Sequence, residues 1–249
     1  MGFLFDLPQP EIKKKIRLIE LFAGVGAQSM AMKAIGADFE IWHPVEFDDF
    51  AIKSYNAIHG RNEKTIDIRD IHGSDLGITD KDKYCYIMFY SFPCTDLSVA
   101  GKMEGMSKKD WENGESTRSG LLWEVERILK ELPNEQLPDF LILENVPQLC
   151  SESNMPEFQK WLDYLKSRGY FSYHDFLNAK DFGIPQNRDR CFCVSILSKE
   201  FIEFEFPKKI PLKYVMKDFL QEEVADSYFI KSEKAEKLIQ QLIDDGKLD

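Results

Sequence analysis

The chain has 249 residues, of which 43% are hydrophobic and 30% are charged, and its formal net charge is −11. This composition is typical of a globular protein with a substantial core. The sequence contains no apolar run of about 18 residues, the length that a membrane span needs. An acidic chain is poorly suited to bind nucleic acid by itself, because that affinity comes largely from Lys and Arg neutralising phosphates.

The cysteines are odd in number and form no C-x-x-C pair: Cys85, Cys94, Cys150, Cys191 and Cys193. This argues against a disulfide framework or a zinc site and predicts a reducing, cytoplasmic location. The four histidines show no metal-like spacing, so no metal site is expected.

Strand and helix patterns alternate along the chain after a lead-in over residues 1–15. We expect strands at 16–22, 39–45, 65–68, 86–92, 138–143, 170–177 and 191–197. We expect helices at 27–36, after a cap at Asp48 or Asp49, and at 119–132, 156–166 and 231–243. The polar, glycine-containing segment 101–118 is either a functional loop or disordered.

This alternation predicts the α/β class, with a doubly wound and mostly parallel sheet. The last two strands are joined by a loop rather than a helix, so one of them is expected to be antiparallel. In such sheets ligands bind at the carboxyl ends of the strands.

The strand that begins at Tyr86 has such an end at Pro93, which lacks an N–H and stops the ladder. Cys94 follows directly. Taken alone, it is either a small buried thiol or a reactive group placed where the sheet meets a loop.

A glycine-rich turn, Phe22-Ala23-Gly24-Val25-Gly26, lies between the first strand and the first helix. Glu46 stands about twenty residues later at the end of the second strand, the spacing at which a carboxylate reaches a ribose diol. A third glycine is absent, which favours a nucleoside cofactor over a dinucleotide. The alternative is a tight turn with an unrelated surface glutamate.

Glu144 closes the strand expected beside that of Cys94, so it should project near Cys94 and could donate a proton. Arg188 and Arg190 alternate with polar residues at the start of a strand and should point to one face, where they could bind a planar acceptor. The alternatives are a surface carboxylate and a solvated sheet edge.

Taken in order, Phe22–Gly26, Ser91–Cys94, Glu144–Val146 and Gln186–Arg190 resemble the DNA (cytosine-5)-methyltransferase family, over roughly residues 16–210. The resemblance implies a Rossmann-like fold that binds S-adenosylmethionine (AdoMet), double-stranded DNA as substrate, and methyl transfer to carbon 5 of a flipped cytosine. It also implies a bacterial or phage-type protein that acts at the nucleoid.

By the same resemblance, Cys94 is the nucleophile, Glu144 binds ring nitrogen 3, and Arg190 binds the oxygen at carbon 2 with support from Arg188. The residues implied in cofactor binding are Phe22, Gly24, Gly26, Glu46, Phe47, Asp67, Ile68, Pro93 and Leu122. The segment 101–118 matches the family's mobile catalytic loop.

The sequence departs from the family at Thr95, where a glutamine is usual, and after Arg190, where no target-recognition domain or closing motif is visible. We therefore expect a catalytic domain at 16–200, an extension at 201–249, and a second polypeptide that supplies recognition and closure. The alternatives are a truncated, inactive AdoMet-binding or protein-interaction module and a non-enzymatic nucleoside-binding regulator.

Overall fold

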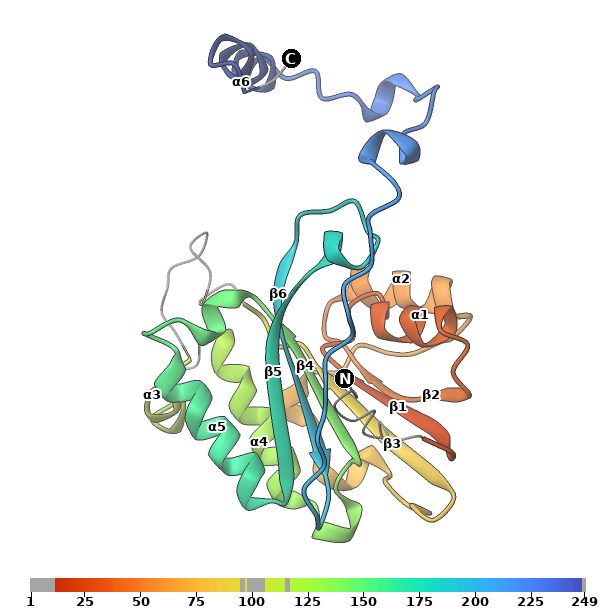
Figure 1. The fold of residues 1–249 in the computed structure, drawn as a ribbon, viewed down its shortest axis with the longest axis vertical. Helices are drawn as coiled ribbons and strands as arrows, with labels where there is room; N and C mark the ends of the chain where they lie inside the picture. The colour runs from red at the N-terminus through yellow and green to blue at the C-terminus, as the bar shows by residue number, and fades with distance from the viewer. Residues whose placement is uncertain (1–11, 95–96, 98–105, 115–116, 248–249) are drawn as a thin grey trace, which may run out of the picture.

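A computed structural model describes residues 12–94, 97, 106–114 and 117–247. Its centre is a six-stranded sheet in the order β2-β1-β3-β4-β6-β5 (Figure 1). The strands are β1 Lys15–Leu21, β2 Phe39–Val45, β3 Tyr84–Tyr90, β4 Phe140–Asn145, β5 Tyr170–Asn178 and β6 Asp189–Leu197.

The sheet is mostly parallel, as predicted. β6 pairs antiparallel with both of its neighbours, β4 and β5, while the pairs β1–β2, β1–β3 and β3–β4 are parallel. The chain turns back through a loop between β5 and β6, which is why β6 alone is reversed. The winding changes direction at β1, with β2 on one side and β3 on the other, and such a switch point opens a crevice for ligands.

Helices cover both faces of this sheet (Figure 1). One face packs against α4 and α5 through residues such as Trp123 and Trp161, and the other packs against Met32 of α1. The helices are α1 Ala27–Ala34, α2 Asp49–His59, α3 Lys108–Glu112, α4 Leu122–Glu131, α5 Met155–Ser167 and α6 Glu233–Asp244. Asp48 caps α2 by accepting from Phe50 and Ala51.

The strand predicted at 65–68 is wrong. The chain there forms a 3-10 turn over Ile68–Asp70, because the Asp67 side chain accepts the backbone N–H of Arg69 and caps the turn. The preceding Ile66 N–H donates to the backbone carbonyl of Glu46, which anchors the segment beside the end of β2.

The segment after β6 first crosses the outer face of β5, where Phe201 and Phe204 contact Phe171 and Tyr173. It then leaves the body of the molecule and ends in α6 (Figure 1). No residue of 201–247 is buried. None of the described helices combines the length and the apolar character needed to cross a bilayer.

Candidate active site

The predicted site residues gather at one edge of the sheet. This edge holds the carboxyl ends of the parallel strands β1, β2, β3 and β4 together with the start of the antiparallel strand β6. Segments far apart in the sequence therefore meet here, at the switch point where β1 separates β2 from β3.

The turn after β1 depends on its glycines. Gly24 and Gly26 have φ of 55° and 78°, values that favour glycine. A Cβ on Gly26 would lie 2.2 Å from Nε2 of His59, whereas one on Gly24 would meet nothing within 4 Å. Gly26 is therefore required for packing against α2, and Gly24 leaves open space beside the backbone.

Phe22 adopts a φ of 59°, which is unusual for a bulky residue. Strain of this kind collects at functional sites, where the surrounding structure fixes it. Phe22 begins the turn and lines the pocket described below. The strained backbone therefore holds this aromatic ring at the site.

Glu46 connects the glycine turn to the end of β2. Its two carboxylate oxygens accept the backbone N–H groups of Gly24 and Asp48, each at 2.8 Å, and its side chain is nearly buried. Charge-assisted bonds of this kind are stronger than neutral ones and hold the carboxylate in one orientation.

Glu20 is a second buried carboxylate behind the same turn. It accepts hydrogen bonds from the backbone N–H and the hydroxyl of Ser29 in α1, and from the Tyr55 hydroxyl in α2. Burial, reinforced by the negative charge of Glu20, raises the pKa of Tyr55 and keeps it a donor. Glu20 thus fixes both helices against β1, a role that its position within a strand did not reveal.

A pocket of about 550 Å³ opens beside these residues. Six of the predicted cofactor residues line it, namely Phe22, Glu46, Phe47, Asp67, Ile68 and Pro93. The lining also includes residues that we did not predict: Val45, Ile66, Arg69, Ser91, Thr117, Arg118 and Leu121.

Three predicted cofactor residues are not part of this lining. Leu122 is fully buried in the core, and its neighbour Leu121 faces the pocket instead. Gly24 and Gly26 shape the turn behind Phe22.

Asp67 and Arg69 form an ion pair at the pocket wall, with Nη2 of Arg69 2.5 Å from Oδ2 of Asp67. The hydrogen bond from the Arg69 side chain lowers the pKa of Asp67 below its ordinary value. Asp67 is therefore a fixed, ionised acceptor beside the pocket.

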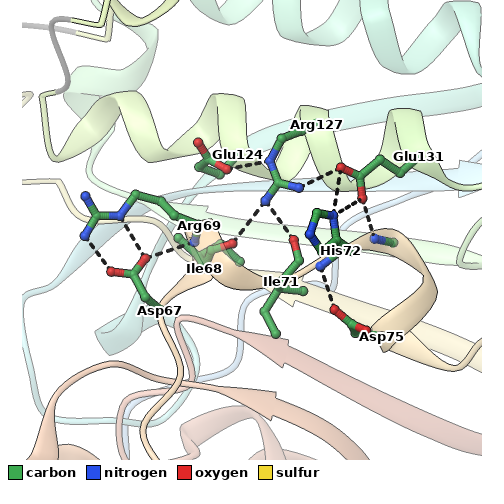
Figure 2. A network of polar contacts seen from close by, with 10 residues as sticks. Asp67, Ile68, Arg69, Ile71, His72, Asp75, Glu124, Arg127 and Glu131 are labelled. Atoms are coloured by element: carbon green, nitrogen blue, oxygen red, sulfur yellow. Dashed lines mark hydrogen bonds and ion pairs between the residues drawn. The ribbon is translucent and has the colours of Figure 1, made fainter.

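The wall that contains Asp67 is held from behind by α4. Figure 2 shows Arg127 pointing from this helix to the carbonyl groups of Ile68 and Ile71, at 3.3 and 2.7 Å. Glu131, one helical turn further on, accepts from the backbone N–H of Gly73 at 2.8 Å. These contacts join residues almost sixty positions apart and were not predicted.

Cys94 lies just after β3 in a loop that is held by hydrogen bonds from two other segments of the chain. Asn145, at the end of β4, donates to the carbonyl of Phe92 at 3.1 Å, and Ser119 donates to the carbonyl of Pro93 at 2.9 Å. Cys94 itself is half-buried. Thr95, at which the sequence departs from the family, lies outside the described residues.

Three of the other cysteines, Cys85, Cys191 and Cys193, have raised pKa values and are less suited to act as nucleophiles. Burial raises the pKa of both Cys85 and Cys193 to about 12, so these thiols stay protonated. A hydrogen bond with Cys150 and burial together raise the pKa of Cys191.

Glu144, Arg188 and Arg190 come together, and both arginines approach the same carboxylate oxygen. Nε of Arg190 lies 2.9 Å from Oε1 of Glu144, and Nη2 of Arg188 lies 3.7 Å from it. Their strands β4 and β6 are neighbours, and β4 also pairs with β3, which leads to Cys94. The Glu144 side chain is 27% exposed and ion-paired, so it is a carboxylate with charged partners rather than an isolated carboxyl group at the end of a strand.

Asn178 organises the loop that presents these arginines. Its side chain donates to Asn187 and Asp189 and accepts the backbone N–H groups of Lys180 and Arg188. Three of these contacts reach nine to eleven positions along the chain, and the role of Asn178 was not predicted from the sequence.

The pocket fits an adenosylated cofactor. Its volume is in the range of small-molecule sites, it combines an aromatic ring with two acidic side chains, and Gly24 leaves room for a close approach. The buried hydroxyl of Ser91 has no hydrogen-bond partner among the described residues, which suits a site for a ligand with polar groups. Within the described ranges, metal-ligating side chains form no group of three or more.

Comparisons with known proteins point to one family. A family model described as C-5 cytosine-specific DNA methylase matches residues 16–247. The type II methyltransferase M2.ScrFI of Lactococcus lactis subsp. cremoris is 33% identical, over 87% of this chain and 71% of its own length. The orphan methyltransferase M.SssI of Spiroplasma monobiae is 32% identical, over 84% of this chain and 67% of its own length.

The fold is similar to that of the Dnmt2 methyltransferase of S. pombe, with a TM-score of 0.68 and 21% identity. That match covers 92% of this chain and 66% of the solved chain. The chain thus spans about two thirds of the length of these relatives.

Proposed function

The chain belongs to the C-5 cytosine-specific DNA methylase family, and we propose that it is the catalytic part of an AdoMet-dependent DNA (cytosine-5)-methyltransferase. One observation carries this proposal. The fastened Cys94 loop, the Glu144–Arg190 pair and the cofactor pocket share one edge of the sheet.

In the proposed reaction, Cys94 adds as a thiolate to carbon 6 of a flipped cytosine and raises the electron density at carbon 5. Glu144 takes up a proton from water as the cytosine replaces its arginine partners, holds ring nitrogen 3 and gives it that proton, so the addition leaves no negative charge on the ring. Arg190 donates to the oxygen at carbon 2, and Arg188 supports the pair. AdoMet supplies the methyl group when it is bound. A base or water then removes the proton at carbon 5, Cys94 leaves as a thiolate, and ring nitrogen 3 returns its proton to Glu144.

Cofactor binding would use the pocket lining. Phe22 and Ile68 would pack on the adenine, Asp67 would accept from its amino group, and Glu46 would bind the ribose hydroxyls. The fixed orientation of both carboxylates supports these roles, because neither must be reorganised before binding.

The decisive test uses DNA that contains 5-fluorocytosine, whose fluorine cannot leave carbon 5 as a proton does, so that the covalent adduct persists. We expect the chain, together with the polypeptide that supplies recognition, to form an adduct through Cys94 with AdoMet present. Cys94→Ser should form none yet bind S-adenosylhomocysteine (AdoHcy) as tightly as the wild type does. AdoHcy binding without an adduct would support the inactive-module alternative, and failure to bind AdoHcy would contradict the proposal.

The second polypeptide for recognition and closure stays a prediction, as does a cytoplasmic site of action. The acidic net charge of the chain supports the prediction of a second polypeptide, because a basic DNA-binding surface would then lie on that partner. We expect the purified chain alone to methylate DNA poorly. Robust, site-specific methylation by this chain without any partner would show that the prediction is wrong.

A further inference from the structure

Arg127 connects α4 to the pocket wall without reaching the pocket itself. It donates to the carbonyls of Ile71 and Ile68 and forms ion pairs with Glu124 and Glu131 on its own helix, at 2.7 and 2.8 Å. Both carboxylates flank the guanidinium on one helix face and hold it toward the turn (Figure 2).

The turn that Arg127 contacts carries Asp67, Ile68 and Arg69, which all line the pocket. Its internal bonds are local, between Asp67 and Arg69 and between the N–H of Ile71 and the carbonyl of Ile68. Local bonds give the turn its shape but do not place it relative to the sheet, so its position depends on contacts from outside.

We propose that Arg127 is a positioning residue for the adenine end of the cofactor pocket. This inference rests on the proposed function. A guanidinium suits the task because its fixed fork can donate to two carbonyls and two carboxylates at once. Loss of Arg127 would remove the side-chain donor of the Ile71 carbonyl, leave the Ile68 carbonyl with only its local bond from the Ile71 N–H, and release the turn from α4.

The chain offers a matched control in Arg168, just after α5. Its guanidinium donates to the carbonyls of Leu129 and Leu132, at 2.7 and 2.8 Å, and to the Tyr164 hydroxyl. It therefore clamps the far end of the same helix by the same kind of bond, but it does not line the pocket. Arg168→Gln should cost stability as Arg127→Gln does, without moving the pocket wall.

The experiment combines amide hydrogen exchange on the free protein with calorimetry of AdoHcy and of methylthioadenosine, which lacks the amino-acid part. We expect Arg127→Gln to lose exchange protection at Ile71 and Gly73 and to bind both ligands about tenfold more weakly, as for loss of one charge-assisted bond. Arg127→Lys keeps the positive charge and can still donate to one carbonyl. It should therefore bind both ligands more tightly than Arg127→Gln does and keep an ion pair with Glu124 or Glu131.

The inference would be overturned if Arg127→Gln and Arg168→Gln showed equal exchange protection at Ile71 and Gly73 and equal affinity for both ligands. A loss confined to AdoHcy would also overturn it, because the amino-acid end would then be the part affected. If the wild type bound neither ligand, the proposed function would fail, and the exchange result would still decide whether Arg127 holds the turn.

Discussion

The two halves of the site are built in different ways. On the cofactor side, buried carboxylates accept backbone N–H groups, as Glu46 does from Gly24 and Asp48. On the side proposed for cytosine, side chains pair with each other, as Glu144 does with Arg190 and Arg188. Hydrogen bonds from a carboxylate to backbone N–H groups hold the main chain of the turn in one conformation. Ion pairs between partly exposed side chains can instead exchange one partner for another. We infer that the first half is preformed and that the second can release Glu144 and Arg190 to a substrate.

The largest effect should come from the glycine turn. Gly26→Ala forces a side chain to a φ of 78° and against His59, so we expect it to destabilise the protein by about 2–4 kcal/mol and to abolish AdoHcy binding. Gly36→Ala is the control, because Gly36 also has a positive φ of 69° but its Cβ would meet nothing within 4 Å. Thermal unfolding and calorimetry measure both changes. Equal losses in the two variants would mean that backbone strain alone, not packing at the turn, explains the effect.

Breaking the ion pair should affect chemistry and leave cofactor binding intact. Arg190→Gln removes the donor 2.9 Å from Glu144, and we expect methyl transfer or adduct formation to slow about 100-fold with unchanged AdoHcy affinity. Arg188→Gln should slow it less, since its Nη2 lies 3.7 Å away and its side chain is 46% exposed. A loss of AdoHcy binding in either variant would contradict the division into two halves.

The sequence predicted the residues of the second half, and Glu144, Arg188 and Arg190 meet as expected, but it predicted only part of the first half. Glu46 and Asp67 follow from spacing or resemblance, and both line the pocket. Leu122 was misplaced by one residue, because the 3-10 turn at Ser119–Leu121 rotates the helix start and turns Leu121 to the pocket. Contacts such as Arg127 to Ile71 join distant segments, and no local pattern in a single sequence encodes them.

Asn145 tests whether the loop of Cys94 is held as firmly as the cofactor turn. Asn145→Ala leaves the Phe92 carbonyl without its donor, so we expect a loss of about 1–3 kcal/mol and slower adduct formation at Cys94. Asn154→Ala is the control, because Asn154, the residue before α5, is also nearly buried and donates to the carbonyl of Gln148. Asn154→Ala should lower the free energy of unfolding about as much as Asn145→Ala does, but it should leave the rate of adduct formation unchanged. Slowing in both variants would show that global stability, not the loop, limits the reaction.

The smallest effect should come from the charge of Asp67. Asp67→Asn still accepts the Arg69 N–H and keeps the turn, but it loses the ion pair. Since the Arg69 side chain lowers the pKa of Asp67 below its ordinary value, the carboxylate stabilises the fold above that ordinary value, and the contribution is lost as pH falls through the lowered pKa. We therefore expect wild type and variant to differ by less than about 1 kcal/mol at neutral pH and to converge in acid. Urea unfolding across pH measures this, with Asp82→Asn, an exposed residue before β3, as the control. A difference that persisted at low pH would assign the effect to the shape of the side chain rather than to its charge.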